Sequence, residues 1–333
     1  MYTCRSRGTM QNTLIRICAA LAASLAIAGA QAQSYPAKPV RLVVGFPPGG
    51  GTDVVARIIL PKFTEYLGQP VVIENRPGAT GTVAAAMVAK SPPDGYTLMM
   101  GHVSVNAIAP SLFKNLQYDV LKDFAPVILT ASVPHFIVVH PTLQVGSLRE
   151  LVALLKAAPG KYTFPSAGNG STPHLAGEMF KSLAGVDLVH VPYKGSGQSM
   201  QDLLAGVHKL AFDTMPASSP FVRSGRMKAL AVSSARRVAD YPDIPTAEEA
   251  GVPGYVISTW YGVFAPAGTP AEIVNRLHAD ILRAMQAPET RPRMQEIGAD
   301  DTVTRTPEEF AAIVRADTAR YAKVVKDAGL KLD

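Results

Sequence analysis

Short runs of β-branched and apolar residues alternate with helical patterns along this chain, and that alternation limits its fold more than any other feature. The runs predict buried strands at 40–44, 71–73, 96–100, 136–139, 162–164, 188–191, 210–212 and 229–232. A helical pattern follows the first run, from Thr52 toward Leu67, and an amphipathic one extends from Ile273 to Met285. Alternating strands and helices predict an α/β fold with largely parallel sheets.

Capping residues predict where several helices begin and end. A Ser or Thr followed three residues later by Glu forms a capping box, and four such pairs begin at Ser147, Thr246, Thr269 and Thr306. Pro61 lies within the first helical pattern and is expected to kink or split it. Gly68 is expected to end that helix, because glycine readily adopts the left-handed conformation found after many helices.

The chain of 333 residues is long enough for two lobes, yet no Pro/Ser-rich linker separates them. We therefore expect discontinuous lobes, with the chain crossing near Ser132–Val139 and Ser258–Phe264, where extended apolar stretches lie beside prolines. This assigns residues 33–134 plus 259–333 to lobe 1 and residues 135–258 to lobe 2, after a leader at 1–32. A ligand cleft is expected between the lobes.

The N-terminus is typical of a secretory signal peptide. Three arginines precede a run of small apolar residues from Ile17 to Ala30, and Ala30-Gln31-Ala32 forms an A-x-A cleavage site. The alternative is a membrane anchor, but the run is shorter than the roughly 20 apolar residues that a span needs. We therefore expect cleavage after Ala32 and a periplasmic protein, whether translation starts at Met1 or Met10.

Composition excludes several classes of protein. Both cysteines, Cys4 and Cys18, lie in the leader, so the exported part has no disulfide, thiolate nucleophile or cysteine-ligated metal. Without the leader, 29 basic and 26 acidic side chains remain, a net charge of +3. No basic run interleaved with aromatic residues predicts nucleic-acid binding. The seven histidines show no metal-binding spacing, so neither a metal nor a cofactor is expected.

A glycine-rich loop follows the first predicted strand and opens the first helix, and it reads Gly45-Phe-Pro-Pro-Gly-Gly-Gly-Thr-Asp53. It lacks the lysine of a phosphate-binding Walker loop, because Gly51 stands at that position. Glycines let backbone N–H groups approach a ligand, and a helix N-terminus carries about half a positive charge. The loop therefore predicts a carboxylate site in which Gly50 tolerates no side chain. The alternative is a tight turn capped by Asp53.

Three further loops of this kind follow predicted strands, at Gly101–Asn106, Ser166–Thr172 and Tyr193–Gly197. Loops at the carboxyl ends of parallel strands bind ligands in open α/β sheets. Two of the four loops fall in each expected lobe, so a cleft lets them converge. Asp213 is either a turn residue or a contact in that cleft.

A hydrolase is the alternative in a different class. Ser171, His174 and Asp213 have the residue types of a catalytic triad, but no G-x-S-x-G sequence surrounds the serine. A Ser three residues before a His is more typical of a helix cap and its first turn. Trp260 and Tyr261 are expected to pack the second crossing, with lining of the cleft as the alternative.

Seven motifs occur in order from Tyr35 onward, and together they resemble one known family. They are Tyr35-Pro-x-Lys-Pro-Val-Arg41, the glycine-rich loop at 45–53, Val71-Val-Ile-Glu-Asn-Arg-Pro-Gly78, Pro93-Asp-Gly-Tyr-Thr-Leu98, Val191-Pro-Tyr-Lys-Gly-Ser196, Pro242-x-Ile-Pro-Thr246 and Trp260-Tyr-Gly262. The combination resembles the Bug family, the periplasmic substrate-binding proteins of tripartite tricarboxylate transporters.

The resemblance implies a periplasmic-binding-protein-like fold of type II, whose two α/β lobes close on a small organic carboxylate without transforming it. Di- and tricarboxylates, acidic amino acids and aromatic acids are the ligands it implies. A monomer is expected, with transporter membrane subunits as its partner. The implied ligand-binding residues are Phe46, Pro48, Gly49, Gly50, Gly51, Thr52, Asp53, His102, Ser104, Val105, Asn106, Ser166, Gly168, Gly170, Ser171, Thr172, His174, Tyr193 and Asp213.

Overall fold

The structure, a computed structural model, describes residues 35–299 and 306–327. The chain divides into two compact units, and the unit Lys38–Asp333 holds all of the helices and strands described below. The predicted leader at 1–32 lies outside the described residues. Among those that are described, no helix has the length and apolar character needed to cross a membrane.

Each of the eight predicted strands overlaps an observed one. The strands are β1 (Val40–Val44), β2 (Val71–Asn75), β3 (Thr97–His102), β4 (Phe124–Val139), β5 (Thr163–Ser166), β6 (Val189–Pro192), β7 (Leu210–Thr214), β8 (Lys228–Val232) and β9 (Ser258–Pro266). The helices are α2 (Gly51–Leu67), α3 (Thr82–Ala89), α4 (Ala109–Leu112), α5 (Leu148–Ala157), α6 (Thr172–Ala184), α7 (Ser196–Leu204), α8 (Met215–Arg223), α9 (Ala271–Gln286), α10 (Arg291–Glu296) and α11 (Pro307–Asp327). Three short turns are helical as well: η1 (Ala79–Gly81), η2 (Ser104–Ile108) and η3 (Pro141–Leu143).

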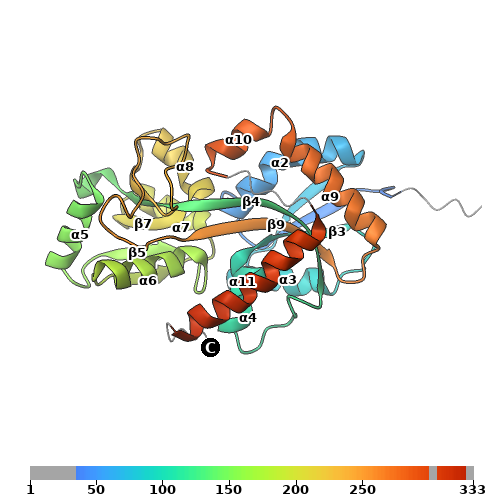
Figure 1. The fold of residues 1–333 in the computed structure, drawn as a ribbon, viewed down its shortest axis with the longest axis horizontal. Helices are drawn as coiled ribbons and strands as arrows, with labels where there is room; N and C mark the ends of the chain where they lie inside the picture. The colour runs from blue at the N-terminus through green and yellow to red at the C-terminus, as the bar shows by residue number, and fades with distance from the viewer. Residues whose placement is uncertain (1–34, 300–305, 328–333) are drawn as a thin grey trace, which may run out of the picture. The chain divides into compact units, whose positions relative to one another are not determined.

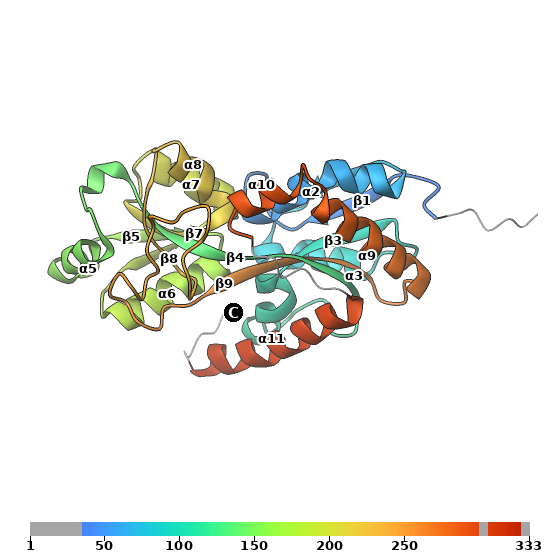
Figure 2. The same cartoon turned by 45° about the horizontal axis from the view of Figure 1, so that its top comes forward.

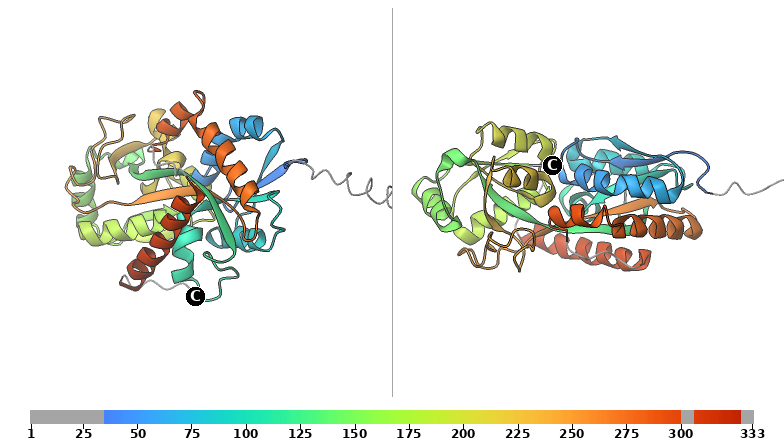
Figure 3. Two further views of the ribbon diagram at one scale, coloured as in Figure 1. Left: turned by 45° about the vertical axis from the view of Figure 1, so that its right-hand side comes forward. Right: turned by 90° about the horizontal axis from the view of Figure 1, so that it is seen from above.

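Two long strands, β4 and β9, link two groups of elements (Figures 1 and 2). The first lobe comprises β1 to α4 together with α9, α10 and α11, and the second lobe comprises α5 to β8. The view from above in Figure 3 shows α5 to α8 at one end of these strands and α2 and α9 at the other. Both segments that were expected to cross between lobes lie in β4 and β9.

The large sheet is mixed, so the prediction of largely parallel sheets is wrong. β1 pairs in parallel with β2 and β3, but β3–β9 and β4–β9 are antiparallel. Beyond Pro134, β4 pairs antiparallel with β7 and β8. The chain crosses once in each direction, and neighbouring crossing strands must therefore run antiparallel.

The end of β4 is buried on both faces, which explains its unbroken apolar sequence. Ile137 and Val139 pack with α5 and α6 in one core cluster, around Phe164 and Phe212. The alternate residues of β4 pack with α7 and α8 in a second cluster on the opposite face. A strand sandwiched in this way shows no polar alternation, because neither side chain direction leads to water.

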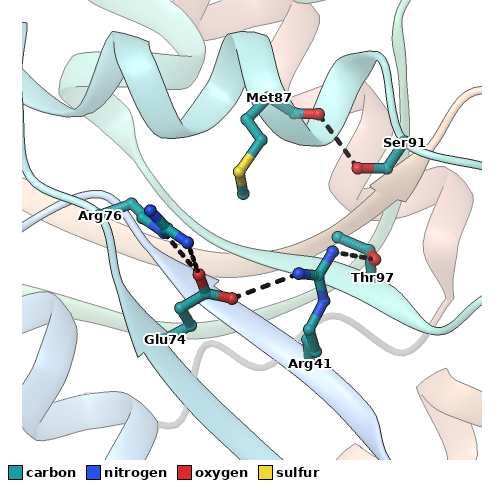
Figure 4. A network of polar contacts seen from close by, with 6 residues as sticks. All are labelled: Arg41, Glu74, Arg76, Met87, Ser91 and Thr97. Atoms are coloured by element: carbon teal, nitrogen blue, oxygen red, sulfur yellow. Dashed lines mark hydrogen bonds and ion pairs between the residues drawn. The ribbon is translucent and has the colours of Figure 1, made fainter.

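In the first lobe, polar side chains tie together the three parallel strands. Arg41 on β1 donates hydrogen bonds to Glu74 on β2 at 3.4 Å and to Thr97 on β3 at 3.1 Å, and Glu74 also pairs with Arg76 (Figure 4). Exposed ion pairs of this kind contribute little stability. These side-chain contacts instead help to fix the register of β1 against both neighbouring strands.

The structure corrects several predicted helix ends. α2 runs unbroken through Pro61 and ends at Gly68, whose φ of 78° is left-handed. The Ser147 box forms, with the hydroxyl accepting from Glu150 N. The Thr246 box also forms, but it closes a turn rather than a helix. At Thr269 the box is wrong: the hydroxyl donates to Pro266 O, and α9 begins after Pro270.

Candidate functional site

The glycine-rich loop brings the N-terminus of α2 to the middle of the molecule. Gly50 caps this helix without any side-chain hydrogen bond, and Val54 N is the first amide to bond back, to Gly50 O. The amides of Gly51, Thr52 and Asp53 have no hydrogen-bond partner among the described residues. These three N–H groups carry the positive end of the helix dipole.

The Asp53 carboxylate fixes the conformation of the loop, and the neighbouring Arg57 balances its charge. Its carboxylate accepts hydrogen bonds from Gly49 N at 3.0 Å, Arg57 at 2.8 Å and Asn75 at 3.0 Å. Burial opposes ionisation of this carboxyl, but the hydrogen bonds outweigh it and lower its pKa. The capped-turn alternative is therefore also present in the structure, beside the free helix start.

The N-terminus of α7 in the second lobe meets the N-terminus of α2. Gly195 caps α7 without a side-chain bond, and Ser199 N is the first amide to bond back, to Gly195 O. A Cβ built on Gly50 would lie 3.9 Å from Ser196 N, and one built on Gly195 would lie 2.5 Å from the Pro47 ring. Two positive helix ends from opposite lobes therefore face each other across a narrow gap.

A cavity of about 10 Å³ remains at this junction, which is space for about one water molecule. Its walls are formed by Phe46, Gly50, Gly51, Thr52, His102, Ala167, Pro173, Ser196, Thr214 and Tyr261. These residues come from both lobes and from β9, and none of them is cationic. The structure thus shows the lobes in a closed arrangement around a small polar space.

Direct hydrogen bonds join the two lobes beside the cavity. Thr172 N at the start of α6 donates to Ser104 Oγ at 3.1 Å, and Thr80 Oγ1 donates to Asn169 O at 2.8 Å. The hydroxyl of Thr172 also lies 2.5 Å from that of Thr259 on β9. Closure therefore involves backbone and hydroxyl groups rather than ion pairs at these points.

Asp213 lies behind the second-lobe wall of the cavity, at the end of β7. Its Oδ1 accepts from Ser196 Oγ at 2.8 Å, Thr214 N at 2.7 Å and Thr214 Oγ1 at 3.4 Å. Its Oδ2 is buried and has no hydrogen-bond partner among the described residues. Burial raises the pKa of Asp213 to about 6.

Two rings complete the cavity. Tyr261 on β9 is buried, and its hydroxyl lacks a hydrogen-bond partner within the described part of the chain. Burial raises the pKa of Tyr261, the neighbouring Thr214 hydroxyl lowers it, and the charge of Asp213 raises it further. His102 packs against Phe46 and Tyr261 with ring centroids 5.2 Å away, and burial lowers its pKa to about 3, so this imidazole is neutral.

The residues predicted for the site divide into those that line the cavity and those that do not. Phe46, Gly50, Gly51, Thr52 and His102 line it. The others do not belong to its lining: Pro48, Gly49, Asp53, Ser104, Val105, Asn106, Ser166, Gly168, Gly170, Ser171, Thr172, His174, Tyr193 and Asp213. Pro48 and Gly49 are exposed, whereas Ser104, Val105 and Asn106 are buried within η2.

Tyr193 turns away from the cavity. Its hydroxyl donates to Asp202 at 2.5 Å and lies 2.8 Å from His208 Nε2, so it is engaged within the second lobe. It borders a separate cavity of about 260 Å³ next to Thr80 and Asn169.

Five lining residues are not among the predicted site residues: Ala167, Pro173, Ser196, Thr214 and Tyr261. Of these, Ala167 and Ser196 lie within two of the predicted ligand loops. Ser196 ends a motif that had been noted, and Thr214 directly follows Asp213. Tyr261 was expected to pack the second crossing, with lining of the cleft as the alternative. No local sequence pattern distinguishes a tyrosine that packs a strand from one whose hydroxyl reaches a helix start in another element.

The catalytic alternative is not supported by the geometry. Ser171 Oγ donates to Gly168 O at 2.6 Å and accepts from His174 N, which is the behaviour of a helix cap. His174 Nδ1 accepts from Gly170 N, and its ring stacks on His190 with centroids 4.0 Å apart. Asp213 bonds to Ser196 and Thr214 instead of His174. Within residues 35–299 and 306–327, no cluster of His, Cys, Asp and Glu could hold a metal ion.

Comparison with known proteins identifies the family of this chain. Residues 55–330 match the model of the tripartite tricarboxylate transporter family receptor. The chain is 38% identical over 324 residues to protein BugT of Bordetella pertussis, covering 96% of this chain and 99% of that protein. It is 36% identical over 305 residues to the UPF0065 protein in the TAR-I ttuE-ttuC' intergenic region of Agrobacterium vitis, covering 90% of this chain and 87% of that relative.

Solved structures are similar over nearly the whole described chain. A structure of the periplasmic binding protein BugD has a TM-score of 0.85 at 36% identity, covering 90% of this chain and all of that one. An R. palustris protein with adipate has a TM-score of 0.86 at 39% identity, with the same coverage. MatC from Rhodopseudomonas palustris, with bound malate, has a TM-score of 0.82 at 36% identity, covering 87% and 100%. The chain therefore belongs to the tripartite tricarboxylate transporter receptor family, as do the Bug proteins, and it has their two-lobed fold.

Proposed function

We propose that this chain is a periplasmic receptor that captures a small organic carboxylate between its lobes and releases it unchanged to the membrane subunits of a tripartite tricarboxylate-type transporter. The observation that carries the proposal is the meeting of the α2 and α7 N-termini at one cavity, where their first amides have no hydrogen-bond partner in the described part of the chain. The positive ends of two helix dipoles repel each other, and an anion between them accepts hydrogen bonds from the amides of both helices.

The chemistry of the cavity favours a carboxylate over a phosphate. No cationic side chain lines it, so a multiply charged phosphate lacks a counter-charge there. One carboxylate has two oxygens, which suit the amides of α2 on one side and those of α7 on the other. Structures of two relatives were described with adipate and with malate, both carboxylates.

Capture requires the lobes to separate first. The closed cavity of about 10 Å³ is far smaller than the several hundred Å³ of typical small-molecule sites. A ligand that touches both lobes then favours a closed state. We propose lobe boundaries at residues 134–135 and 258–259, cleavage of the leader after Ala32, a monomeric receptor and no catalysis.

The experiment is titration calorimetry of natively purified protein against a panel of carboxylates and their neutral primary amides. We expect carboxylates to bind and the matched amides to fail, because an amide brings no charge to the helix ends. Mass spectrometry of released ligand should return it unaltered. Equal binding of an acid and its amide would contradict the proposed anion site, and a product of different mass would show catalysis.

A further inference from the structure

A second polar feature of the cavity concerns what the ligand carries besides its carboxylate. Ser196 and Thr214 both line the cavity, and each has one hydroxyl proton. Ser196 Oγ donates its proton to Asp213 Oδ1 at 2.8 Å, and Thr214 Oγ1 points its own to the same oxygen at 3.4 Å. A hydroxyl whose proton is used in this way presents only lone pairs to its other neighbours. Asp213 therefore turns two potential donors into acceptors.

Asp213 adds an acceptor of its own. Oδ1 is saturated by three donors, but Oδ2 has no partner among the described residues although the side chain is completely buried. A buried acceptor without a donor is costly. The starts of α7 and α8 adjoin this carboxylate, and their dipoles favour its negative form.

One of the acceptors, Thr214 Oγ1, lies close to the proposed carboxylate site at the α2 start. A Cβ built on Gly51, at the α2 start, would lie 2.8 Å from Thr214 Oγ1 and 2.2 Å from the Tyr261 hydroxyl. A ligand whose carboxylate bonds to α2 thus places the adjacent carbon beside Thr214 Oγ1, and Ser196 lines the same cavity. A bare methylene at that carbon leaves the acceptors unpaired.

We propose that the ligand carries a hydrogen-bond donor, either a hydroxyl or an ammonium group, on the carbon next to its carboxylate, and that Asp213 is the residue that selects for it. This inference rests on the proposed function, since it assumes carboxylate binding at the α2 start. Asp213 acts both through its own Oδ2 and through the orientation that it imposes on Ser196.

The test uses matched ligand series on several carbon skeletons: propionate, lactate and alanine; succinate, malate and aspartate; glutarate, 2-hydroxyglutarate and glutamate; phenylacetate, mandelate and phenylglycine. Affinities are measured by calorimetry on the full mature protein. On whichever skeleton binds, we expect a substituted member to bind at least about tenfold more tightly than the unsubstituted acid. The hydroxyl and ammonium members distinguish a neutral donor from a charged one.

Substitutions at Asp213 and Ser196 test whether these residues cause the preference for substituted acids. Asp213→Asn keeps an oxygen for Ser196 and Thr214 N but places an N–H₂ donor where Oδ2 stands, so we expect the preference to fall to about threefold or less. Ser196→Ala removes the oriented acceptor and should also reduce it, which keeps the test valid if Asp213→Asn folds poorly. Asp187→Asn is the matched control, because Asp187 is an exposed carboxylate of the same lobe.

The outcomes separate the two proposals. If unsubstituted acids bind the native protein as tightly as their substituted partners, the inference about the donor is overturned and the carboxylate receptor stands. If both variants keep the native preference, Asp213 is not its source and the inference fails. If no acid on any skeleton binds while the protein is folded, the proposed function itself is contradicted.

Discussion

At the residue scale, two adjacent glycines of the first loop have different roles. Gly50 was expected to exclude any side chain, but its φ is −79° and a Cβ there would meet nothing closer than 3.6 Å. Gly51 is the crowded position, since its Cβ would lie 2.2 Å from the Tyr261 hydroxyl. Space at the cavity, rather than backbone conformation, therefore makes Gly51 the sensitive glycine.

The matched pair Gly51→Ala and Gly50→Ala tests this difference. Alanine is a good helix former at Gly51, the first residue of α2. Gly50 is the N-cap and has an extended backbone that alanine also adopts, so both variants should fold. We expect Gly51→Ala to weaken ligand binding by about a hundredfold, because the methyl group enters the cavity, and Gly50→Ala to change it less than about fivefold. Calorimetry with the identified carboxylate and thermal melts check this. Equal effects of the two substitutions would contradict the cavity geometry.

The stability of the folded protein in acid depends on the buried carboxyl of Asp213. Burial raises the pKa of Asp213 to about 6 from its ordinary 3.8, against hydrogen bonds from Ser196 and Thr214. Between about pH 4 and pH 6 the folded state holds this proton more tightly than the unfolded chain, so this group's contribution to stability falls as pH rises. A shift of that size corresponds to about 3 kcal/mol.

Asp213→Asn removes this titration. The free energy of unfolding of the variant minus that of the native protein should therefore increase from pH 4 to pH 6, by up to about 3 kcal/mol. Urea unfolding across this range, without ligand, measures the difference. A difference that stays flat between pH 4 and pH 6 argues that the carboxyl has an ordinary pKa in the folded protein.

At the element scale, Ser171 belongs to the start of α6 rather than to a catalytic triad. Its hydroxyl accepts from His174 N and donates to Gly168 O. Ser147 has the same capping role at the start of α5. The two helices lie in the same lobe and contribute to the same core cluster, which makes their caps comparable.

Both Ser171→Ala and Ser147→Ala should lower the free energy of unfolding by about 1 kcal/mol, the usual worth of a helix cap. Denaturant titration measures both. We further expect no hydrolytic activity toward ester substrates in the native protein, and hence none for Ser171→Ala to remove. Ester hydrolysis that disappears only in Ser171→Ala would restore the enzyme alternative.

At the scale of the whole molecule, hydrogen bonds between the lobes hold the closed arrangement. Thr80 Oγ1 contributes one such bond, to Asn169 O, and Thr80 itself has a φ of 55°, a conformation that few residues other than glycine adopt. Thr80→Ala keeps the Cβ but removes the hydroxyl. Loss of a neutral hydrogen bond should shift the closed-to-open ratio by about three- to tenfold toward open.

Small-angle scattering measures this shift. Saturating ligand should decrease the radius of gyration of the native protein, and Thr80→Ala should need more ligand to reach the same value. Thr142→Ala is the control, because the Thr142 hydroxyl bonds only within the second lobe. Profiles that do not change when a confirmed ligand binds would mean that the lobes do not move on binding.

Local sequence determines most of the strands of this protein and some of its helix ends. The eight predicted strands, the end of α2 at Gly68 and the box at Ser147 all follow from interactions within a few residues, and these are the features that the structure confirms. The glycine-rich loop before α2 was predictable for the same reason, because the strand, turn and helix that define it are contiguous in the chain.

Only the tertiary structure decides which of these loops meet. The mixed sheet arises because β4 and β9 cross side by side in opposite directions, although about 120 residues of chain separate them. The same crossing brings Tyr261 of β9 next to Gly51 of α2 and Thr214 of β7. Whether a hydroxyl at the cavity donates or accepts a hydrogen bond then depends on the group toward which its proton points. From the sequence alone, the Ser196 hydroxyl is expected to donate a hydrogen bond to a ligand. In the structure it donates to the buried carboxylate of Asp213, and only its lone pairs remain to accept hydrogen bonds.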